Sequence, residues 1–154
     1  MFDEILGLPL HPLIIHVPVI LTPLLAVLAI VYALAPRVRG VTTWALVGLA
    51  PVVPLSVFAA RLSGEALLAS SRFSSVGGEA ALRIAEHESF SIPLLLATLA
   101  LGLVSLGLVH VSRGDRFGRP VRLAVSGLTV VVAVVALYYV VRAGHSGATA
   151  AWGS

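Results

Sequence analysis

Four long runs of apolar residues divide the chain. They cover residues 13–35, 41–60, 90–111 and 121–141, and each is close to the roughly 20 residues that an α-helix needs to cross the hydrocarbon core of a bilayer. The connectors within each pair of runs are short, so the paired helices are expected to be antiparallel. The pattern predicts an all-α fold in which residues 1–154 form one domain, an antiparallel integral membrane four-helix bundle.

A more polar segment, residues 61–89, separates the second run from the third. Its stretch GGEAALRIAEHES predicts a short amphipathic helix lying on the membrane surface, in the loop between spans two and three. Within the second run, Pro51 and Pro54 each remove a helical hydrogen bond, which predicts a kink. We find no internal repeat in the sequence, because the two helical hairpins share length and loop size but no motif.

Composition supports insertion in a membrane. Of the 154 residues, 58% are hydrophobic and 11% are charged, and the mean hydropathy is +1.04, far from the values of soluble domains. All ten basic residues are arginines, and they lie between the apolar runs instead of forming one basic face, so nucleic acid is not an expected partner. The absence of cysteine excludes disulfides, thiolate metal sites and covalent attachment of haem through a CxxCH motif.

The arginines also predict an orientation. The two short connectors and the start of the fourth run hold Arg37, Arg39, Arg113, Arg116, Arg119 and Arg122. By the positive-inside tendency, both connectors face the cytoplasm. We therefore expect a multi-pass protein of the bacterial inner (plasma) membrane with both termini outside the cytoplasm, although Arg61, Arg72 and Arg83 in the polar segment oppose this bias.

The stretch LHPLIIHVP, residues 10–18, carries two histidines at the start of the first apolar run. Pro12 suits the first turn of a helix, which places His11 at the helix entrance and His16 about one turn inside. In a continuous helix, five steps of about 100° turn the two rings roughly 140° apart. We expect one ring to face the bundle and the other to face outward.

Other ionisable residues gather at the same predicted end of the bundle. Imidazoles with nearby carboxylates suit iron, copper or zinc, and two opposed imidazoles suit the axial positions of a non-covalent haem. We therefore expect haem b or a transition metal (Fe, Cu or Zn), with His16, His87 and His145 as ligands. Supporting or further binding roles fall to His11, Glu65 and Glu88, whereas His110 belongs to the opposite end.

Several functions remain open at this point. Electron transfer through the bound cofactor is the favoured hypothesis, with a redox partner, a larger membrane complex or a second copy of the chain as partner. The alternative is a structural subunit whose histidines only lock helices together. A proton-coupled carrier is less well supported, because no carboxylate lies mid-membrane. Neither a GxSxG nor an HExxH motif is present, so no catalytic residue is assigned and an enzyme is less favoured than a binding protein.

Four motifs resemble a bacterial family of four-helix membrane proteins catalogued as domain of unknown function 2231. They are LHPLIIHVPVI, the SGEA at 63–66, the HES at 87–89 and the closing GHSGATAAWG. The positions that match the family outline are His11, Pro12, His16, Pro18, Gly64, Glu65, His87, Glu88, Gly144, His145 and Gly147. Some members of this family are joined to Rieske-type or cytochrome-like modules, so the resemblance implies redox work.

Overall fold

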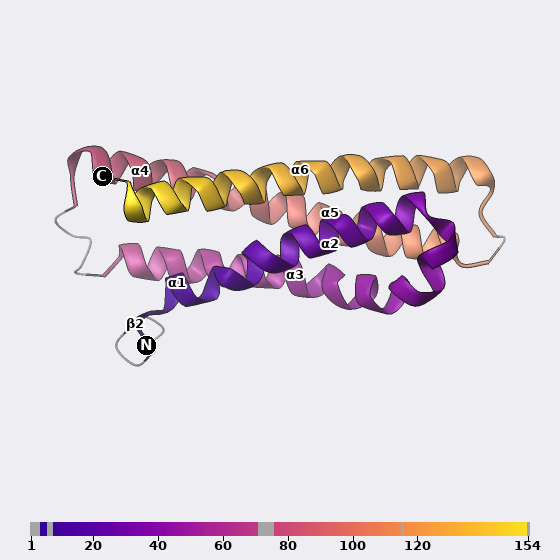
Figure 1. The fold of residues 1–154 in the computed structure, drawn as a ribbon, viewed down its shortest axis with the longest axis horizontal. Coiled ribbons are helices and arrows are strands. Elements are labelled where there is room, and N and C mark those ends of the chain that lie inside the picture. The colour runs from indigo at the N-terminus through magenta and orange to yellow at the C-terminus, as the bar shows by residue number, and fades with distance from the viewer. Residues whose placement is uncertain (1–3, 6–7, 71–75, 115, 154) are drawn as a thin grey trace.

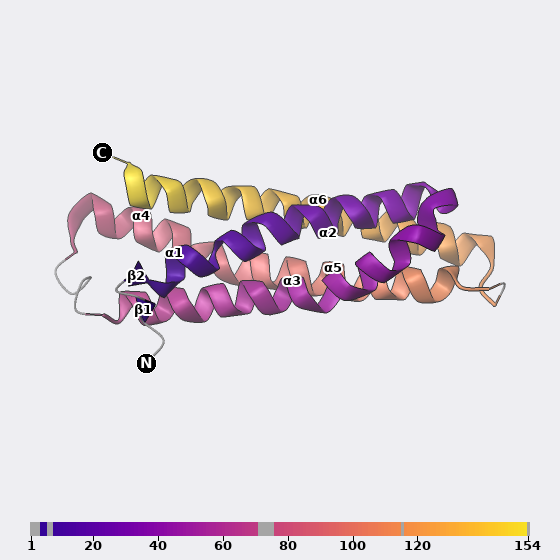
Figure 2. The same cartoon turned by 60° about the horizontal axis from the view of Figure 1, so that its bottom comes forward.

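The computed structural model describes residues 4–5, 8–70, 76–114 and 116–153. It is a long bundle of helices (Figures 1 and 2). A two-residue hairpin, β1 (Glu4–Ile5) and β2 (Leu8–Pro9), precedes the helices and was not expected. The helical elements are α1 (Leu10–Ile14), α2 (His16–Leu34), the 3-10 turn η1 (Pro36–Val38), α3 (Arg39–Leu68), α4 (Gly78–Ser89), α5 (Ser91–Ser112) and α6 (Arg119–Trp152).

Four helical stretches are long and apolar enough to cross a membrane, as the hydropathy pattern predicted: Leu10–Leu34, Pro36–Leu68, Gly78–Ser112 and Arg119–Trp152. Neighbouring long helices are antiparallel, and each of α2 and α5 packs against both α3 and α6. The short helices α1 and α4 pack on α3 and α6 respectively. They lie at the end of the bundle where the described chain also begins and ends (Figure 1), which we call the histidine end.

The second and fourth spans continue beyond their apolar runs. α3 reaches Leu68 and α6 reaches Trp152, because α1 and α4 pack alongside these extensions. The expected amphipathic helix is present as α4, and it has no buried residue. It continues the line of α5 and packs against α6 (Figure 1). Residues 71–75, which include Arg72, lie outside the described part of the chain.

Prolines shape the helices in two ways. Ile15 separates α1 from α2, and Pro18, which has no N–H to donate to the carbonyl of Ile14, explains the break. Pro51 and Pro54 leave α3 continuous from Arg39 to Leu68. Pro54 nevertheless deprives the Ala50 carbonyl of its helical donor, and α5 approaches this oxygen so closely that a Cβ on Gly102 would lie 2.5 Å from it. α3 and α5 therefore make backbone contact in mid-bundle.

Small side chains and leucines fill the space between the four long helices. Fully buried members include Leu25, Ala26, Ala29, Leu46, Leu101, Leu108, Ala133 and Ala136. At the end opposite the histidines, the Arg39 guanidinium donates to the carbonyls of Tyr32 and Ala33 at 2.9 and 3.2 Å and lies over the Tyr32 ring. An arginine therefore satisfies carbonyls that the last turn of α2 leaves without helical donors.

The bundle is an internal duplication, which corrects our expectation of no repeat. The buried positions of α2 recur on α5 in the same order and at the same spacing, with Pro18, Thr22, Leu25, Ala26, Ala29, Tyr32 and Ala33 matching Leu94, Thr98, Leu101, Gly102, Ser105, Leu108 and Val109. Five of the seven buried positions of α3 recur on α6 at the same spacing, with Leu46, Ala50, Val53, Val57 and Ser63 matching Thr129, Ala133, Ala136, Val140 and Ser146. Because α2 matches α5 and α3 matches α6, the two halves are related by a pseudo-twofold axis along the bundle.

Candidate functional site

His11 is held against α3 by a shared hydrogen bond. Its Nδ1 lies 3.0 Å from the Ala60 carbonyl oxygen and 3.0 Å from Ser63 Oγ. A carbonyl oxygen only accepts, so Nδ1 carries the proton, and Ser63 Oγ donates its own proton to the same carbonyl at 2.8 Å. The Nε2 atom therefore keeps its lone pair.

His87 repeats this arrangement on the other half of the bundle. Its Nδ1 lies 3.0 Å from the Ala143 carbonyl oxygen and 3.2 Å from Ser146 Oγ, and Ser146 Oγ donates to the same carbonyl at 3.2 Å. The duplication thus extends from the buried positions to the polar contacts. Both imidazoles have the same tautomer, with the proton on Nδ1 and the lone pair on Nε2.

A glycine beneath each ring permits the close approach. A Cβ on Gly64 would lie 3.0 Å from Cε1 of His11, and a Cβ on Gly147 would lie 2.9 Å from Cε1 of His87. Real Cβ atoms essentially never come as close as 2.9 Å to another heavy atom, and 3.0 Å is tighter than nine in ten of their contacts. The motif Ala-x-x-Ser-Gly occurs at 60–64 and again at 143–147, and we call it the histidine cradle. Its alanine supplies the carbonyl oxygen, its serine supplies the hydroxyl group, and its glycine leaves the backbone open to the ring.

The two cradled rings lie beside each other at the histidine end. Their centroids are 6.4 Å apart and their planes are inclined by 67°. Each ring comes from a short helix of a different half, α1 or α4, and each is bonded to the long helix of its own half. The site is therefore composed of two equivalent parts, with the pseudo-twofold axis passing between the imidazoles.

The three expected ligands His16, His87 and His145 do not form a group. His16 and His145 are exposed, and the described residues contain no cluster of three or more histidines or carboxylates able to hold a metal ion. The physical reason is helical rotation, because His145 precedes the inward-facing Ser146 by one step of about 100°. His11, expected in a supporting role, is the ring that lies beside His87, whereas His16 begins a separate helix and is exposed.

The carboxylates also differ in position from the expectation. Glu65 is exposed and pairs with Arg61 at 2.5 Å, one turn away on α3. Glu88 is exposed on α4 and lines a pocket together with Arg61. His110 lies at the opposite end, where its ring contacts Phe117. Neither carboxylate hydrogen-bonds to an imidazole in the described part of the chain.

Ala60, Ser63, Ala143 and Ser146 were missed by reasoning from sequence. The signal that identifies them is the repeated Ala-x-x-Ser-Gly motif. It is short and built from common residue types, so it becomes visible only once Ser63 and Ser146 are seen at equivalent positions on two helices. The spacing from His11 to Ala60 is 49 residues and that from His87 to Ala143 is 56, which hides the repeat from a search at constant period.

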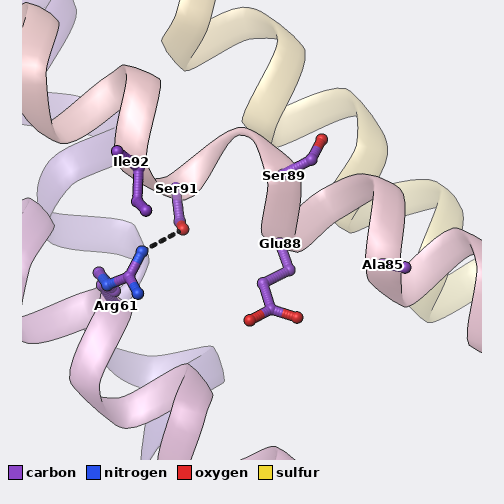
Figure 3. A pocket seen from close by; sticks show the side chains of 6 residues that line it. All are labelled: Arg61, Ala85, Glu88, Ser89, Ser91 and Ile92. Atoms are coloured by element: carbon purple, nitrogen blue, oxygen red, sulfur yellow. Dashed lines mark hydrogen bonds between the residues drawn. The ribbon is translucent and has the colours of Figure 1, made fainter.

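A pocket of about 330 Å³ lies at the histidine end of the bundle, between α3 and the junction of α4 and α5. Arg61 stands on one side of it and Glu88 on the other (Figure 3). Arg61 donates to Ser91 Oγ at 2.9 Å. The remaining lining residues are Ala85, Ser89 and Ile92.

Fold and hydropathy together define a four-span helical membrane protein with a paired-histidine site at one end. The chain belongs to the family described as predicted membrane protein (DUF2231), whose model matches residues 7–154. No curated protein matches the chain, and no solved structure matches it either.

Proposed function

We propose that this protein carries electrons in a bilayer, with a haem b or a redox-active transition metal bound between His11 and His87. The observation that carries the proposal is the pair of equivalent imidazoles, each fixed by a backbone carbonyl and 6.4 Å apart. Histidine ligands of metals commonly donate Nδ1–H to a carbonyl, which orients Nε2 and raises its basicity. The cradles supply this feature twice.

The separation of the rings supports a shared metal. Metal–nitrogen bonds to imidazole are about 2.0 Å long, so two rings bound through Nε2 on opposite sides of one metal ion have centroids about 6 Å apart. The centroids of His11 and His87 are 6.4 Å apart. A ligand set of two histidines suits haem iron or copper. His16, His145, Glu65 and Glu88, which were predicted to bind or support the cofactor, stand outside this pair in the proposal.

An absorption spectrum of detergent-purified protein, before and after dithionite, combined with elemental analysis, tests the proposal. Haem is expected to give a reducible visible band, and copper or iron a stoichiometric metal content. His11→Asn and His87→Asn are expected to lose the cofactor, because an Asn amide can still donate to the carbonyl but offers no aromatic nitrogen to the metal. The exposed His16→Asn and His145→Asn are matched controls that retain it.

A structural role is the second candidate, and the same hydrogen bonds favour it. They tie α1 to α3 and α4 to α6, which is what a lock between helices requires. If the role is structural, the Asn variants retain fold and assembly. No variant then changes the visible absorption spectrum, because the wild-type protein holds no cofactor that absorbs. Wild-type protein that is colourless, metal-free and unable to take up added haem, copper or iron would leave only this role.

The orientation belongs to the proposal as well. We infer that the histidine end faces away from the cytoplasm, in the inner membrane, because the arginines of both short connectors lie at the other end of the bundle (Figure 1). Electrons would then enter or leave the site near the outer surface of the membrane.

A further inference from the structure

The pocket between α3 and the junction of α4 and α5 carries opposite charges on its two sides. The guanidinium of Arg61 lies on one side and the carboxylate of Glu88 on the other (Figure 3). Within the described part of the chain these two groups do not pair with each other, and the carboxylate that pairs with Arg61 is that of Glu65, at 2.5 Å. Unlike charges that face one hollow without closing on each other leave room for a molecule that carries both charges.

The Arg61 side of the pocket suits a phosphate group. A guanidinium has five N–H donors, and the ones in use donate to Ser91 Oγ at 2.9 Å and pair with Glu65. The remaining donors are free to bind phosphate oxygens, for which the planar guanidinium is well shaped. Since Ser91 Oγ accepts from Arg61, its own hydroxyl proton can be donated to the same phosphate.

The opposite side of the pocket suits a primary ammonium group. The Glu88 carboxylate only accepts hydrogen bonds when ionised. Ser89 gives its proton to the Glu86 carbonyl at 2.6 Å, so its Oγ offers lone pairs to the pocket. An ammonium group has three N–H donors and a positive charge, and it therefore matches both acceptors.

The pocket lies at the level of the lipid headgroups. Arg61 directly follows the second apolar run of the sequence, and Ser89 directly precedes the third. The headgroup regions extend about 5–7 Å beyond the hydrocarbon core on each side. One helical turn closer to the middle of the bundle, Phe58 on α3 and Leu96 on α5 are exposed, and these two helices pack against each other. A lipid whose headgroup fills the pocket thus finds apolar side chains for its acyl chains.

The duplication shows that the fold does not need polar groups here. The polar residues that line the pocket are Arg61, Glu88, Ser89 and Ser91. Across the pseudo-twofold axis, the equivalent positions carry Gly144, Pro12, Leu13 and Ile15. One position, Ile92 against His16, differs in the opposite sense. A guanidinium, a carboxylate and two hydroxyls on one side of the bundle alone indicate a task that only this side has acquired.

We propose that this pocket binds the headgroup of a zwitterionic phospholipid, phosphatidylethanolamine, from the leaflet at the histidine end. The phosphate lies against Arg61 and Ser91, and the ammonium group lies against Glu88 and Ser89. The volume of about 330 Å³ is at the lower end of the range for ligand pockets, which starts at about 300 Å³, and so suits one headgroup. The site is independent of the proposed cofactor, because neither imidazole of the histidine pair lines the pocket.

Charge and hydrogen bonding select this lipid over two other common phospholipids. Phosphatidylcholine carries a positive charge, but its trimethylammonium group has no N–H to donate to a carboxylate. Phosphatidylglycerol has a phosphate for Arg61 but no positive group to set against Glu88. Phosphatidylethanolamine alone among the three combines the phosphate with a hydrogen-bonding cation.

Native mass spectrometry of the detergent-purified protein, with dioleoyl forms of the three lipids in competition, tests the site. Wild type is expected to retain phosphatidylethanolamine in preference to the other two. Arg61→Gln and Glu88→Gln should each weaken this retention about tenfold or more, the effect of losing a hydrogen bond to a charged group. Arg83→Gln is a matched control, because Arg83 also pairs with a glutamate one turn away, and Glu86→Gln is the control for Glu88.

Glu88→Arg gives a result that misfolding cannot imitate. It sets two cations against the headgroup, so the preference should pass from phosphatidylethanolamine to the anionic phosphatidylglycerol. Equal retention of the three lipids by wild type, or an unchanged preference in the variants of Arg61 and Glu88, would overturn the proposal. Soluble glycerophosphoethanolamine that displaces the lipid at equal concentration would overturn the assignment to a membrane lipid. A colourless protein that still shows the expected preference would overturn the electron-transfer function and leave this site intact.

Discussion

Two glycines decide how closely the imidazoles approach their long helices. Gly147 has room for no Cβ, because that atom would lie 2.9 Å from the His87 ring, whereas Gly144 on the same helix has nothing within 4 Å. Contact with the His87 ring therefore requires a glycine at position 147, whereas no contact requires one at position 144. Gly64 repeats the constraint beneath His11, at 3.0 Å.

Replacing either cradle glycine by alanine is therefore expected to displace the ring and weaken the cofactor site. Gly64→Ala and Gly147→Ala should cost about 1–3 kcal/mol, the usual penalty of overpacking, and should lower cofactor content. Gly144→Ala should keep the content and leave thermal stability unchanged or raised, since alanine favours a helix over glycine by about 1 kcal/mol. Titration with haem or copper measures the cofactor content, and thermal unfolding in detergent measures the stability. Equal behaviour of all three variants would contradict the cradle.

The limits of reading the sequence are clearest at single residues. The position of His11, His16, His87 and His145 near one end of the bundle followed from the four apolar runs. The choice between His11 and His16 did not follow, because it depends on how α1 is rotated against α3. His145 was favoured over Ser146 on chemistry alone, yet the helical phase of α6 turns the serine inward and the histidine outward. Packing between elements sets that phase.

At the level of elements, the closest helix contact is the crossing of α3 and α5. Pro54 leaves the Ala50 carbonyl without its helical donor, and the Cα of Gly102 packs against this oxygen. Contacts of a Cα–H group with a carbonyl oxygen are known between closely packed helices. Pro54 thus frees the carbonyl oxygen that Gly102 contacts, and the absence of a side chain on Gly102 lets α5 approach that oxygen.

Gly102→Ala is expected to push these helices apart. Its Cβ would lie 2.5 Å from a backbone oxygen, which cannot move aside as a side chain would. A destabilisation of about 1–3 kcal/mol follows, seen as a lower midpoint of thermal unfolding in detergent. Gly107→Ala on the same helix has nothing within 4 Å of its Cβ and serves as control. Identical midpoints for the two variants would show that α5 does not press on α3 at this point.

The hydropathy pattern predicted the boundaries of the apolar part of each helix, but not those of its polar extension. The four spans are recovered because a run of apolar residues must be helical to cross a bilayer. The extensions of α3 to Leu68 and of α6 to Trp152 contain Arg61, Glu65 and Arg142, whose charges suggested loops. These residues remain helical because ion pairs such as Arg61–Glu65, and contacts with α1 and α4, stabilise the extended turns.

For the whole molecule, the duplication explains why the site lies at one end and on the axis. Each half is a long helical hairpin with a short histidine-bearing helix at its start, and neither half alone brings two imidazoles together. The halves differ by a longer connection between α5 and α6, so the repeat has no constant period. This is why it escaped detection along the sequence but is plain in the paired buried positions.

The last prediction concerns how the molecule sits in the membrane. Arginine-rich connectors at one end and paired histidines at the other predict that residue 77 is outside and residue 118 inside. The chain has no cysteine, so Gly77→Cys and Gly118→Cys each provide a unique thiol. Both glycines are exposed, and neither would place a Cβ closer than 3.6 Å to another residue. A membrane-impermeant maleimide applied to intact cells should label Gly77→Cys and should reach Gly118→Cys only after permeabilisation. The reverse pattern would place the histidine pair at the cytoplasmic face, and the electron donor or acceptor would then have to be sought on that side.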